Sequence, residues 1–460
     1  MKRSLFVIVG SLVLAAAFSV TPSSVAVGAG PTPPNVVIFV SDDQAKGTMD
    51  AMPAVRALIA REGVTLTNGI IPTSICCPSR AALLSGRYAR STGVYKNVGT
   101  NGGWPTFNSS GAEDRTIAVA LQDAGYRTGL FGKYLNGYGG LAPSGYVPPG
   151  WDQFRAIYNP DGKPALSANA YYDYNLHGTG DDVSYGSEAS DYSTDVITSE
   201  SVQFINSAPA DQPLFLYYAT TGPHAPFTPA PRHIGTWPNE TLNPAAYTLT
   251  LNRPKWRPDT TLSQRKWITK QASAHEALMS VDEGVEAVVN ALGDRVDNTL
   301  FVYLSDNGLQ FGEHGLSNKN EPYSGSTEVP MYLRWNGAIP AGTKSTSPVT
   351  NADLTATIAD AAGVSLFRPD GVSFFSATRP RGVVLEAVSS ASHPAYCGYR
   401  TRRFMYVEYD MRKGREFFDY RDDPDELVNK VKWNRYTNRV AVLRDEAMSG
   451  CSPTPEGFDW

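Results

Sequence analysis

The sequence has 460 residues, of which 42% are hydrophobic and 18% are charged. This composition excludes a chain that is disordered throughout, because it can bury a large core. The formal net charge of -5 argues against a general nucleic-acid-binding protein, which usually carries a basic excess.

The N-terminal segment is typical of a signal peptide, which we predict to span residues 1–29. Lys2 and Arg3 supply its positive charge, residues 5–20 are almost wholly apolar, and small residues follow them. A membrane anchor is the alternative, but the apolar run is shorter than the roughly 20 residues that a span needs. We therefore expect a secreted protein with no stable association with a membrane.

Short apolar runs alternate with helical stretches and predict an α/β fold with a mostly parallel central sheet flanked by helices. The runs are rich in β-branched and aromatic residues and are bounded by turn residues, as strands buried on both faces are. They cover residues 35–40, 127–131, 214–218 and 299–304. The helical stretches between them cover residues 117–124, 194–205 and 264–292.

Two regions depart from this alternation. Residues 138–191 are rich in Gly, Tyr, Asn and Asp and lack periodicity, so we expect long loops there. Residues 376–460 look like a small antiparallel subdomain with a C-terminal helix, placed after a main domain that covers residues 30–375. Its strand-like segments and its amphipathic stretch cover residues 403–408, 416–420 and 439–448.

Polar residues that can do chemistry follow the predicted strands at the point where each strand ends. They are Asp42 and Asp43, Lys133, His224, and Asp306 with Asn307. Open α/β sheets bind their ligands at the carboxyl ends of the strands. We therefore expect these side chains to share one site.

The sequence has four cysteines. Cys397 and Cys451 lie in the last quarter of the chain, and in an exported protein we expect them to form a disulfide. Cys76 and Cys77 are adjacent and too constrained to pair comfortably with each other. Two unpaired thiols in an oxidising compartment need a chemical reason.

Cys76 opens the most specific string of the sequence, Cys-Cys-Pro-Ser-Arg-Ala-Ala-Leu-Leu-Ser-Gly-Arg. Pro78 suits a first helical turn and Gly86 suits a helix end, so we expect a helix that begins near Cys76. The helix dipole and Arg80 would then lower the pKa of the Cys76 thiol and attract an anion. The alternative is a helix start that merely contains two buried cysteines.

The string resembles the signature of the type I sulfatases along its whole length, and the resemblance covers residues 34–429. It implies an alkaline-phosphatase-like fold and hydrolysis of sulfate monoesters. In that family the first cysteine is oxidised to formylglycine by a dedicated enzyme that reads the Cys, Pro and Arg of the string. The resemblance thus implies that Cys76 is the modified nucleophile and that a formylglycine-generating enzyme is a partner during maturation.

The acidic pair after the first strand and the Asp-Asn pair after the last resemble the two metal-binding segments of the family. The resemblance implies a metal site made of Asp42, Asp43, Cys76, Asp306 and Asn307. Carboxylate and amide oxygens suit Ca²⁺, or alternatively Mg²⁺, rather than zinc.

The resemblance also implies roles for single residues. Lys133, His224 and Lys319 fall where sulfatases contact sulfate, and Arg80 and the lysines would neutralise charge on the transferred group. One hydroxyl of hydrated formylglycine attacks sulfur, and the second expels sulfate from the covalent intermediate. Asp306 is the family's candidate for accepting the nucleophile's proton, and His224 for protonating the leaving alcohol.

One residue departs from the pattern of many arylsulfatases. Leu135 stands two positions after Lys133, where those relatives have a histidine that helps to release sulfate. The sequence therefore does not identify the residue that acts as the base in that step. Residues 132–136, Gly-Lys-Tyr-Leu-Asn, are instead similar to the branch of N-acetylglucosamine-6-sulfatases and extracellular heparan 6-O-endosulfatases. Residues 146–151 and 171–176 agree with that branch.

We therefore expect the substrate to be a sulfated sugar such as N-acetylglucosamine 6-sulfate, since the Tyr- and Asn-rich region also suits a sugar. A small aryl or alkyl sulfate is the second choice. Two other functions stay open. A phosphonate monoester or phosphodiester hydrolase would share the fold and the formylglycine, and a secreted glycan-binding protein would have lost catalysis.

Overall fold

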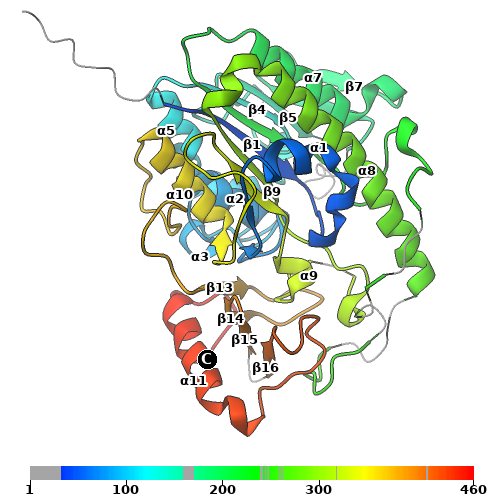
Figure 1. Cartoon of the computed structure of the whole chain (residues 1–460), viewed down its shortest axis with the longest axis vertical. Helices are drawn as coiled ribbons and strands as arrows, with labels where there is room; N and C mark the ends of the chain where they lie inside the picture. The colour runs from blue at the N-terminus through cyan, green and yellow to red at the C-terminus, as the bar shows by residue number, and fades with distance from the viewer. Residues whose placement is uncertain are drawn as a thin grey trace, which may run out of the picture. The chain divides into compact units, whose positions relative to one another are not determined.

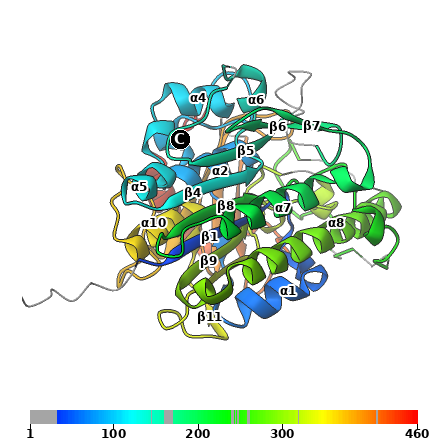
Figure 2. The same ribbon diagram turned by 90° about the horizontal axis from the view of Figure 1, so that it is seen from above.

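The structure is a computed structural model that describes residues 33–143, 145–158, 170–238, 242–243, 245, 248–257, 261, 263–317, 319–410 and 413–460. The predicted signal peptide lies outside these residues. Figures 1 and 2 show a large sheet between two layers of helices and a second, smaller sheet with its own helix. The domain boundary at residue 376 stays a prediction.

Ten described strands form the large sheet, in the order β11-β2-β10-β9-β1-β8-β4-β5-β6-β7. The five central strands are parallel. They are β9 (Thr299–Ser305), β1 (Asn35–Ser41), β8 (Leu214–Ala219), β4 (Arg127–Gly132) and β5 (Gln153–Tyr158). The four strands predicted from apolar runs are confirmed, and each is one residue longer at its carboxyl end.

The outer strands of the large sheet run mostly antiparallel to their neighbours. On one side lie β10 (Met331–Arg334), β2 (Val64–Leu66) and β11 (Thr343–Ser345), and on the other lie β6 (Tyr174–Gly178) and β7 (Val183–Tyr185). A separate pair joins β3 (Gly69–Ile70) to β12 (Val349–Thr350).

The central strands are continuous apolar runs because helices cover both faces of the sheet (Figure 2). Val36 and Ile38 of β1 pack toward one helical layer, and Val37 and Phe39 pack toward the other. The first layer contains α2 (Cys76–Ser85), α5 (Ile117–Asp123) and α10 (Asn351–Ala362). The second contains α1 (Pro53–Val55), α7 (Ser193–Asn206) and α8 (Gln264–Ala291).

The other helices of the main domain are short, and the helices predicted over residues 117–124, 194–205 and 264–292 are confirmed to within one residue. The short helices are α3 (Ala89–Thr92), α4 (Gly103–Ser109), α6 (Tyr138–Leu141) and α9 (Ser324–Thr327). In the part of the chain that the structure describes, no helix combines the length and the apolar character needed to cross a membrane.

The prediction of long loops over residues 138–191 is wrong for much of the described part. β5, β6 and β7 lie there and extend the sheet beyond β4. Their aromatic neighbours point into the protein: Trp151 stacks on Phe215 with ring centroids 5.4 Å apart, and Tyr174 stacks on Tyr185 at 5.0 Å. Strands near a sheet edge are only partly covered, so they lack the continuous apolar run that marks the central strands.

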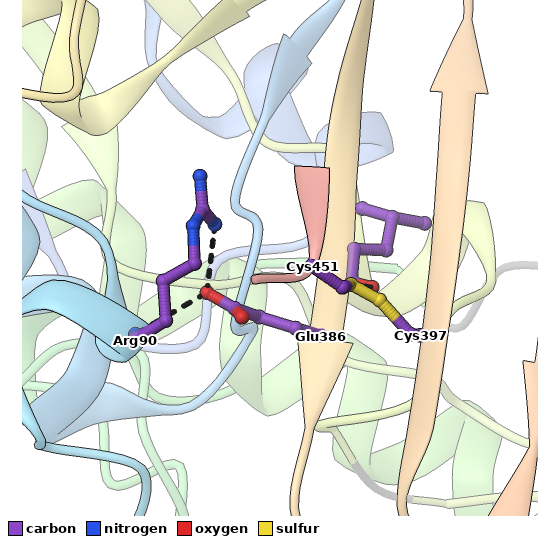
Figure 3. The surroundings of a disulfide bond; sticks show 5 residues. Arg90, Glu386, Cys397 and Cys451 are labelled. Atoms are coloured by element: carbon purple, nitrogen blue, oxygen red, sulfur yellow. Dashed lines mark hydrogen bonds and ion pairs between the residues drawn. A yellow bond between two sulfur atoms is a disulfide. The ribbon is translucent and has the colours of Figure 1, made fainter. Parts of the chain in front are cut away.

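The smaller sheet has four antiparallel strands, and α11 (Thr437–Gly450) packs on it through Val440, Leu443 and Ala447. The strands are β13 (Gly382–Ala387), β14 (Tyr396–Thr401), β15 (Phe404–Tyr409) and β16 (Gly414–Asp419). The predicted antiparallel sheet with its helix is confirmed, although the sequence indicated only two of the four strands. Cys397 and Cys451 form the predicted disulfide between β14 and the end of α11 (Figure 3).

A buried ion pair joins the smaller sheet to the helices of the main domain. Figure 3 shows Arg90 of α3 beside Glu386 of β13, with 3.1 Å between Nη1 and Oε1. Glu386 has no exposed surface, and a buried carboxylate needs such a partner to avoid a large desolvation cost.

Candidate active site

The predicted site residues gather at the carboxyl ends of four neighbouring strands. β9, β1, β8 and β4 are adjacent in the sheet, so the turns that follow them lie at one edge. Backbone hydrogen bonds of 2.8 to 3.0 Å join these turns, from Asp306 to Ser41, from Asp42 to Gly222 and from Lys133 to Ala219.

Cys76 stands at the first position of α2, as the sequence predicts. Its side chain is 1% exposed, and its Sγ lies 3.7 Å from Oδ1 of Asp42 and 2.9 Å from Nζ of Lys319. The helix ends at Gly86, whose φ of 70° suits glycine. The N-terminus of α2 and the ammonium of Lys319 therefore put positive charge beside this sulfur.

Cys77 has a different environment although it is the next residue. It is fully buried in the apolar core under α2, and Asn97 accepts a hydrogen bond of 2.8 Å from its backbone N–H. Burial raises the pKa of the Cys77 thiol to about 12, so it stays a neutral thiol. Of the two adjacent cysteines, Cys76 is the one that faces the carboxylates.

Three cations neutralise three carboxylates around Cys76. The ion pairs are Arg80–Asp306, Lys133–Asp42 and Lys319–Asp43. The Arg80 side chain is 1% exposed; its Nε donates to Asp306 at 2.8 Å, and its Nη1 donates to the backbone oxygen of Lys133 at 2.9 Å. Arg80 thus connects α2 to the turns after β9 and β4.

Burial opposes ionisation of the two lysine–aspartate pairs, but the neighbouring charges outweigh it. Burial alone would raise the pKa of Asp42, yet Lys133 and His224 hold that pKa below its usual value. Burial alone would also raise the pKa of Asp43, but Lys319 and His224 together hold that pKa below its usual value. Burial would lower the pKa of Lys133 and of Lys319, but the paired carboxylates raise both. The Lys133–Asp42 and Lys319–Asp43 pairs therefore stay charged.

His224 lies in the turn after β8, and its Nε2 faces the carboxylates. Its Nδ1 is 2.6 Å from the backbone oxygen of Ala225, so Nδ1 carries the hydrogen and donates it. Its Nε2 is 3.5 Å from Oδ2 of Asp43. Burial disfavours a charged imidazole, but Asp43 and Asp42 raise the pKa of His224 to about 9.

The cluster has the chemistry of a site for a hard divalent cation. Ligand atoms of four side chains lie within 4.8 Å of one another, from Asp42, Asp43, Cys76 and His224. Beside them, Nδ2 of Asn307 donates to Asp43 at 2.7 Å, while its Oδ1 is buried without a hydrogen-bond partner. Oδ1 of Asp306 accepts from the backbone N–H of Asp43 at 3.1 Å. Carboxylates and a buried amide oxygen fit such an ion.

Leu135 takes no part in the cluster. Its side chain is 4% exposed and packs in the apolar core with residues of α2 and β4.

The sequence did not indicate two residues that support the site, because no local pattern marks them. Asn351 donates to the backbone oxygen of Ser79 at 2.8 Å and so fixes α2, and the Tyr171 hydroxyl donates to the backbone oxygen of His224 at 2.7 Å.

Known proteins are similar to most of the chain. The Sulfatase family model matches residues 34–364. A putative extracellular sulfatase Sulf-1 homolog of Caenorhabditis elegans is 35% identical over 352 residues, which cover 72% of this chain and 47% of that protein. The N-acetylglucosamine-6-sulfatase of Homo sapiens is 31% identical over 385 residues, which cover 77% of this chain and 66% of that protein. The chain thus spans less than two thirds of either relative.

Solved structures share the fold. One, solved in complex with its substrate D-glucosamine-2-N,6-O-disulfate, has a TM-score of 0.75 at 22% identity and covers 91% of this chain and 98% of its own. The phosphonate monoester hydrolase of Silicibacter pomeroyi has a TM-score of 0.70 at 20% identity, with coverage of 92% and 96%. These similarities confirm the predicted alkaline-phosphatase-like architecture, and a shared fold carries no conclusion on chemistry.

Proposed function

The chain belongs to the sulfatase family, and from that membership we propose that it hydrolyses sulfate monoesters with Cys76, oxidised to formylglycine, as its nucleophile. The observation that carries the proposal is the position of Cys76 at the start of α2, 3.7 Å from Asp42 and 2.9 Å from Lys319. When Cys76 is oxidised, its hydrate offers one hydroxyl to attack sulfur and a second to expel sulfate.

The surrounding side chains suit the transfer of an anionic group. Arg80, Lys133 and Lys319 gather three positive charges in a buried site, where charge stabilisation is strongest. Asp306 would accept the proton of the attacking hydroxyl. His224 would protonate the leaving alcohol through Nε2, because its Nδ1 is already bonded to Ala225.

We propose that a divalent cation, Ca²⁺ or Mg²⁺, completes the site. Asp42, Asp43, Asp306 and Asn307 would hold it together with residue 76, whose sulfur here stands for an oxygen of the modified side chain. The buried Oδ1 of Asn307, which has no hydrogen-bond partner, supports this assignment. When bound, such a cation supplies Lewis-acid stabilisation of the transferred group.

A sulfated sugar, with N-acetylglucosamine 6-sulfate first, is the proposed substrate. A relative named N-acetylglucosamine-6-sulfatase and a neighbour solved with a glucosamine disulfate support this choice. The Tyr-rich region does not support a sugar substrate, because Tyr171 and Tyr174 are buried.

The relative named an extracellular sulfatase supports the proposal that this protein is secreted. Modification of Cys76 would need a formylglycine-generating enzyme.

The proposal is tested by expressing the protein in an aerobic host that contains the maturation enzyme. Peptide mass spectrometry should find an aldehyde at residue 76, and Cys76→Ala should lower kcat/KM for an aryl sulfate by about 10³-fold or more. Cys77→Ala is the matched control and should keep kcat/KM within about fivefold, because Cys77 faces the core. Full activity in Cys76→Ala would exclude the mechanism.

A phosphonate monoester hydrolase is the second candidate, because such an enzyme shares the fold. Comparison of kcat/KM for an aryl sulfate and for the matching aryl phosphonate ester separates the two functions. A ratio that favours the phosphonate ester would overturn the sulfatase proposal.

A further inference from the structure

A basic groove lies between the smaller sheet and the segment that precedes α8. Its volume is about 1010 Å³, and none of the described residues that line it carries a carboxylate. Five of its lining residues are cationic: Arg253, Lys255, Lys413, Arg415 and Lys432. The chain as a whole has a net charge of -5, so this local concentration of positive charge indicates a binding site for an anionic ligand.

Four of these cations are available to a ligand. Lys255, Lys413, Arg415 and Lys432 are exposed, and none of them forms an ion pair with a described residue. Elsewhere on the surface the exposed Arg232 is bound by two carboxylates. The groove therefore keeps positive charge that the protein itself does not neutralise.

The groove is built from three segments that the fold fixes to one another. Nδ2 of Asn429 donates to the backbone oxygens of Asn252 at 3.1 Å and of Arg415 at 3.0 Å. Gly414, with a φ of 132°, lets β16 approach Pro254, whose Cβ would lie 2.8 Å from any added Cβ. These contacts fix the positions of the cations relative to one another, so the cations do not lie on independent loops.

Two tryptophans lie among the cations. Trp433 is 38% exposed, and Trp256 packs edge-on against Tyr409 with ring centroids 4.9 Å apart. Indole faces give sugar rings a large apolar surface with little loss of conformational entropy. Cations pair with sulfate or carboxylate groups. Aromatic rings beside exposed cations match an acidic polysaccharide, because its sugar rings need an apolar face and its acidic groups need positive charge.

We propose that this basic groove binds a segment of an anionic polysaccharide that carries sulfate or carboxylate groups along its chain. The inference rests on the proposed function, since a polymeric sulfate ester carries charges beyond the one that is hydrolysed. No residue of the groove belongs to the Cys76 cluster. The groove would hold the polymer and would not take part in the chemistry.

The experiment measures the Kd of a heparan sulfate 12-mer by calorimetry, using the full chain with Cys76→Ala so that the ligand is not consumed. Adding Lys413→Ser and Arg415→Ser should raise Kd about tenfold or more, because the two lost contacts to charged groups are together worth about a tenfold change or more. The matched control, Lys344→Ser with Arg381→Ser, removes the same charge from exposed sites outside the groove and should change Kd less than about twofold.

Trp433→Ala and the pair Lys255→Ser with Lys432→Ser provide independent variants if the first pair does not fold. Equal Kd values for groove and control variants would overturn the proposal, and so would equal affinity for duplex DNA or for anionic lipid vesicles. If the groove variants weaken binding while the unsubstituted protein hydrolyses no sulfate ester, the groove stands and the proposed function fails. If hydrolysis is present and binding is unchanged, the groove fails alone.

Discussion

Arg80 is the residue that holds the cluster together. Its guanidinium bonds Asp306 after β9 and the backbone of Lys133 after β4 from a position one turn into α2. Burial opposes its charge, but Asp306 and Asp42 raise the pKa of Arg80 above its usual value. A fork of donors is needed here, because one nitrogen cannot reach both partners. Its fixed geometry in turn positions the helix that carries Cys76.

Arg80→Lys should lower kcat/KM for a sulfate ester by about 10²-fold, since charge is kept but one of the two buried partners loses its donor. Urea unfolding should also show a loss of about 1–3 kcal/mol. Activity is divided by the fraction of protein that carries the aldehyde, because the proposed maturation enzyme would also read this arginine. Arg87→Lys, whose side chain lies over Phe367 outside the cluster, is the control. A corrected kcat/KM within threefold of the unsubstituted protein would contradict this role.

At the scale of elements, α8 anchors the chain that leaves the site. The segment after Asp43 turns into α1, and Asp282 of α8 accepts hydrogen bonds of 2.8 Å from the backbone N–H groups of Ala54 and Val55. A carboxylate at a helix N-terminus is favourable. Burial nevertheless raises the pKa of Asp282 to about 6, so desolvation outweighs the two hydrogen bonds.

This shift predicts a pH dependence of stability. The pKa of an aspartate in the unfolded chain is about 3.9, which lies below the folded value of about 6. The contribution of Asp282 is therefore fully present below about pH 3.9 and is lost as the pH rises through about 6. Between pH 4 and 7.5 the unsubstituted protein should lose about 2 kcal/mol relative to Asp282→Asn in urea unfolding. Asp211→Asn, at an exposed aspartate, should follow the unsubstituted protein. If the free energies of unfolding of Asp282→Asn and of the unsubstituted protein changed in parallel with pH, the raised pKa of Asp282 would be refuted.

At the scale of the whole molecule, charge is concentrated where the two core layers meet the carboxyl edge of the sheet. Asp42, Asp43 and Asp306 lie there with exposed fractions of at most 4%. Buried ion pairs contribute little net stability, because desolvation offsets attraction. A cation that binds the folded carboxylates and not the unfolded chain would stabilise the entire domain by mass action.

Removal of divalent cations with EDTA should therefore lower Tm as well as activity. Ca²⁺ at 100 times its Kd should restore about 2.7 kcal/mol of stability, measured by calorimetry. Asp43→Asn should lose most of this increment, whereas Asp211→Asn should keep it. A Tm that does not respond to Ca²⁺ or Mg²⁺ would contradict the metal site.

The sequence alone determined the elements that depend on local pattern. β1, β4, β8 and β9 are continuous apolar runs, so their bounds followed to within one residue, and Pro78 and Gly86 marked the ends of α2. The polar residues after those strands pointed to one shared edge because parallel strands end on the same side. No comparable signal marked β5 to β7, whose partial burial breaks the apolar pattern.

Only the tertiary structure decided which side chains meet. Cys76 and Cys77 are neighbours in the chain, yet the path of α2 turns one toward Asp42 and the other into the core. The pairing of each lysine with its carboxylate, and the support that Tyr171 gives to His224, join residues far apart in sequence. The basic groove likewise brings together residues 252–256, 413–415 and 429–433. Such contacts depend on how the helices, turns and sheets pack against one another. A local sequence pattern carries no information about this packing.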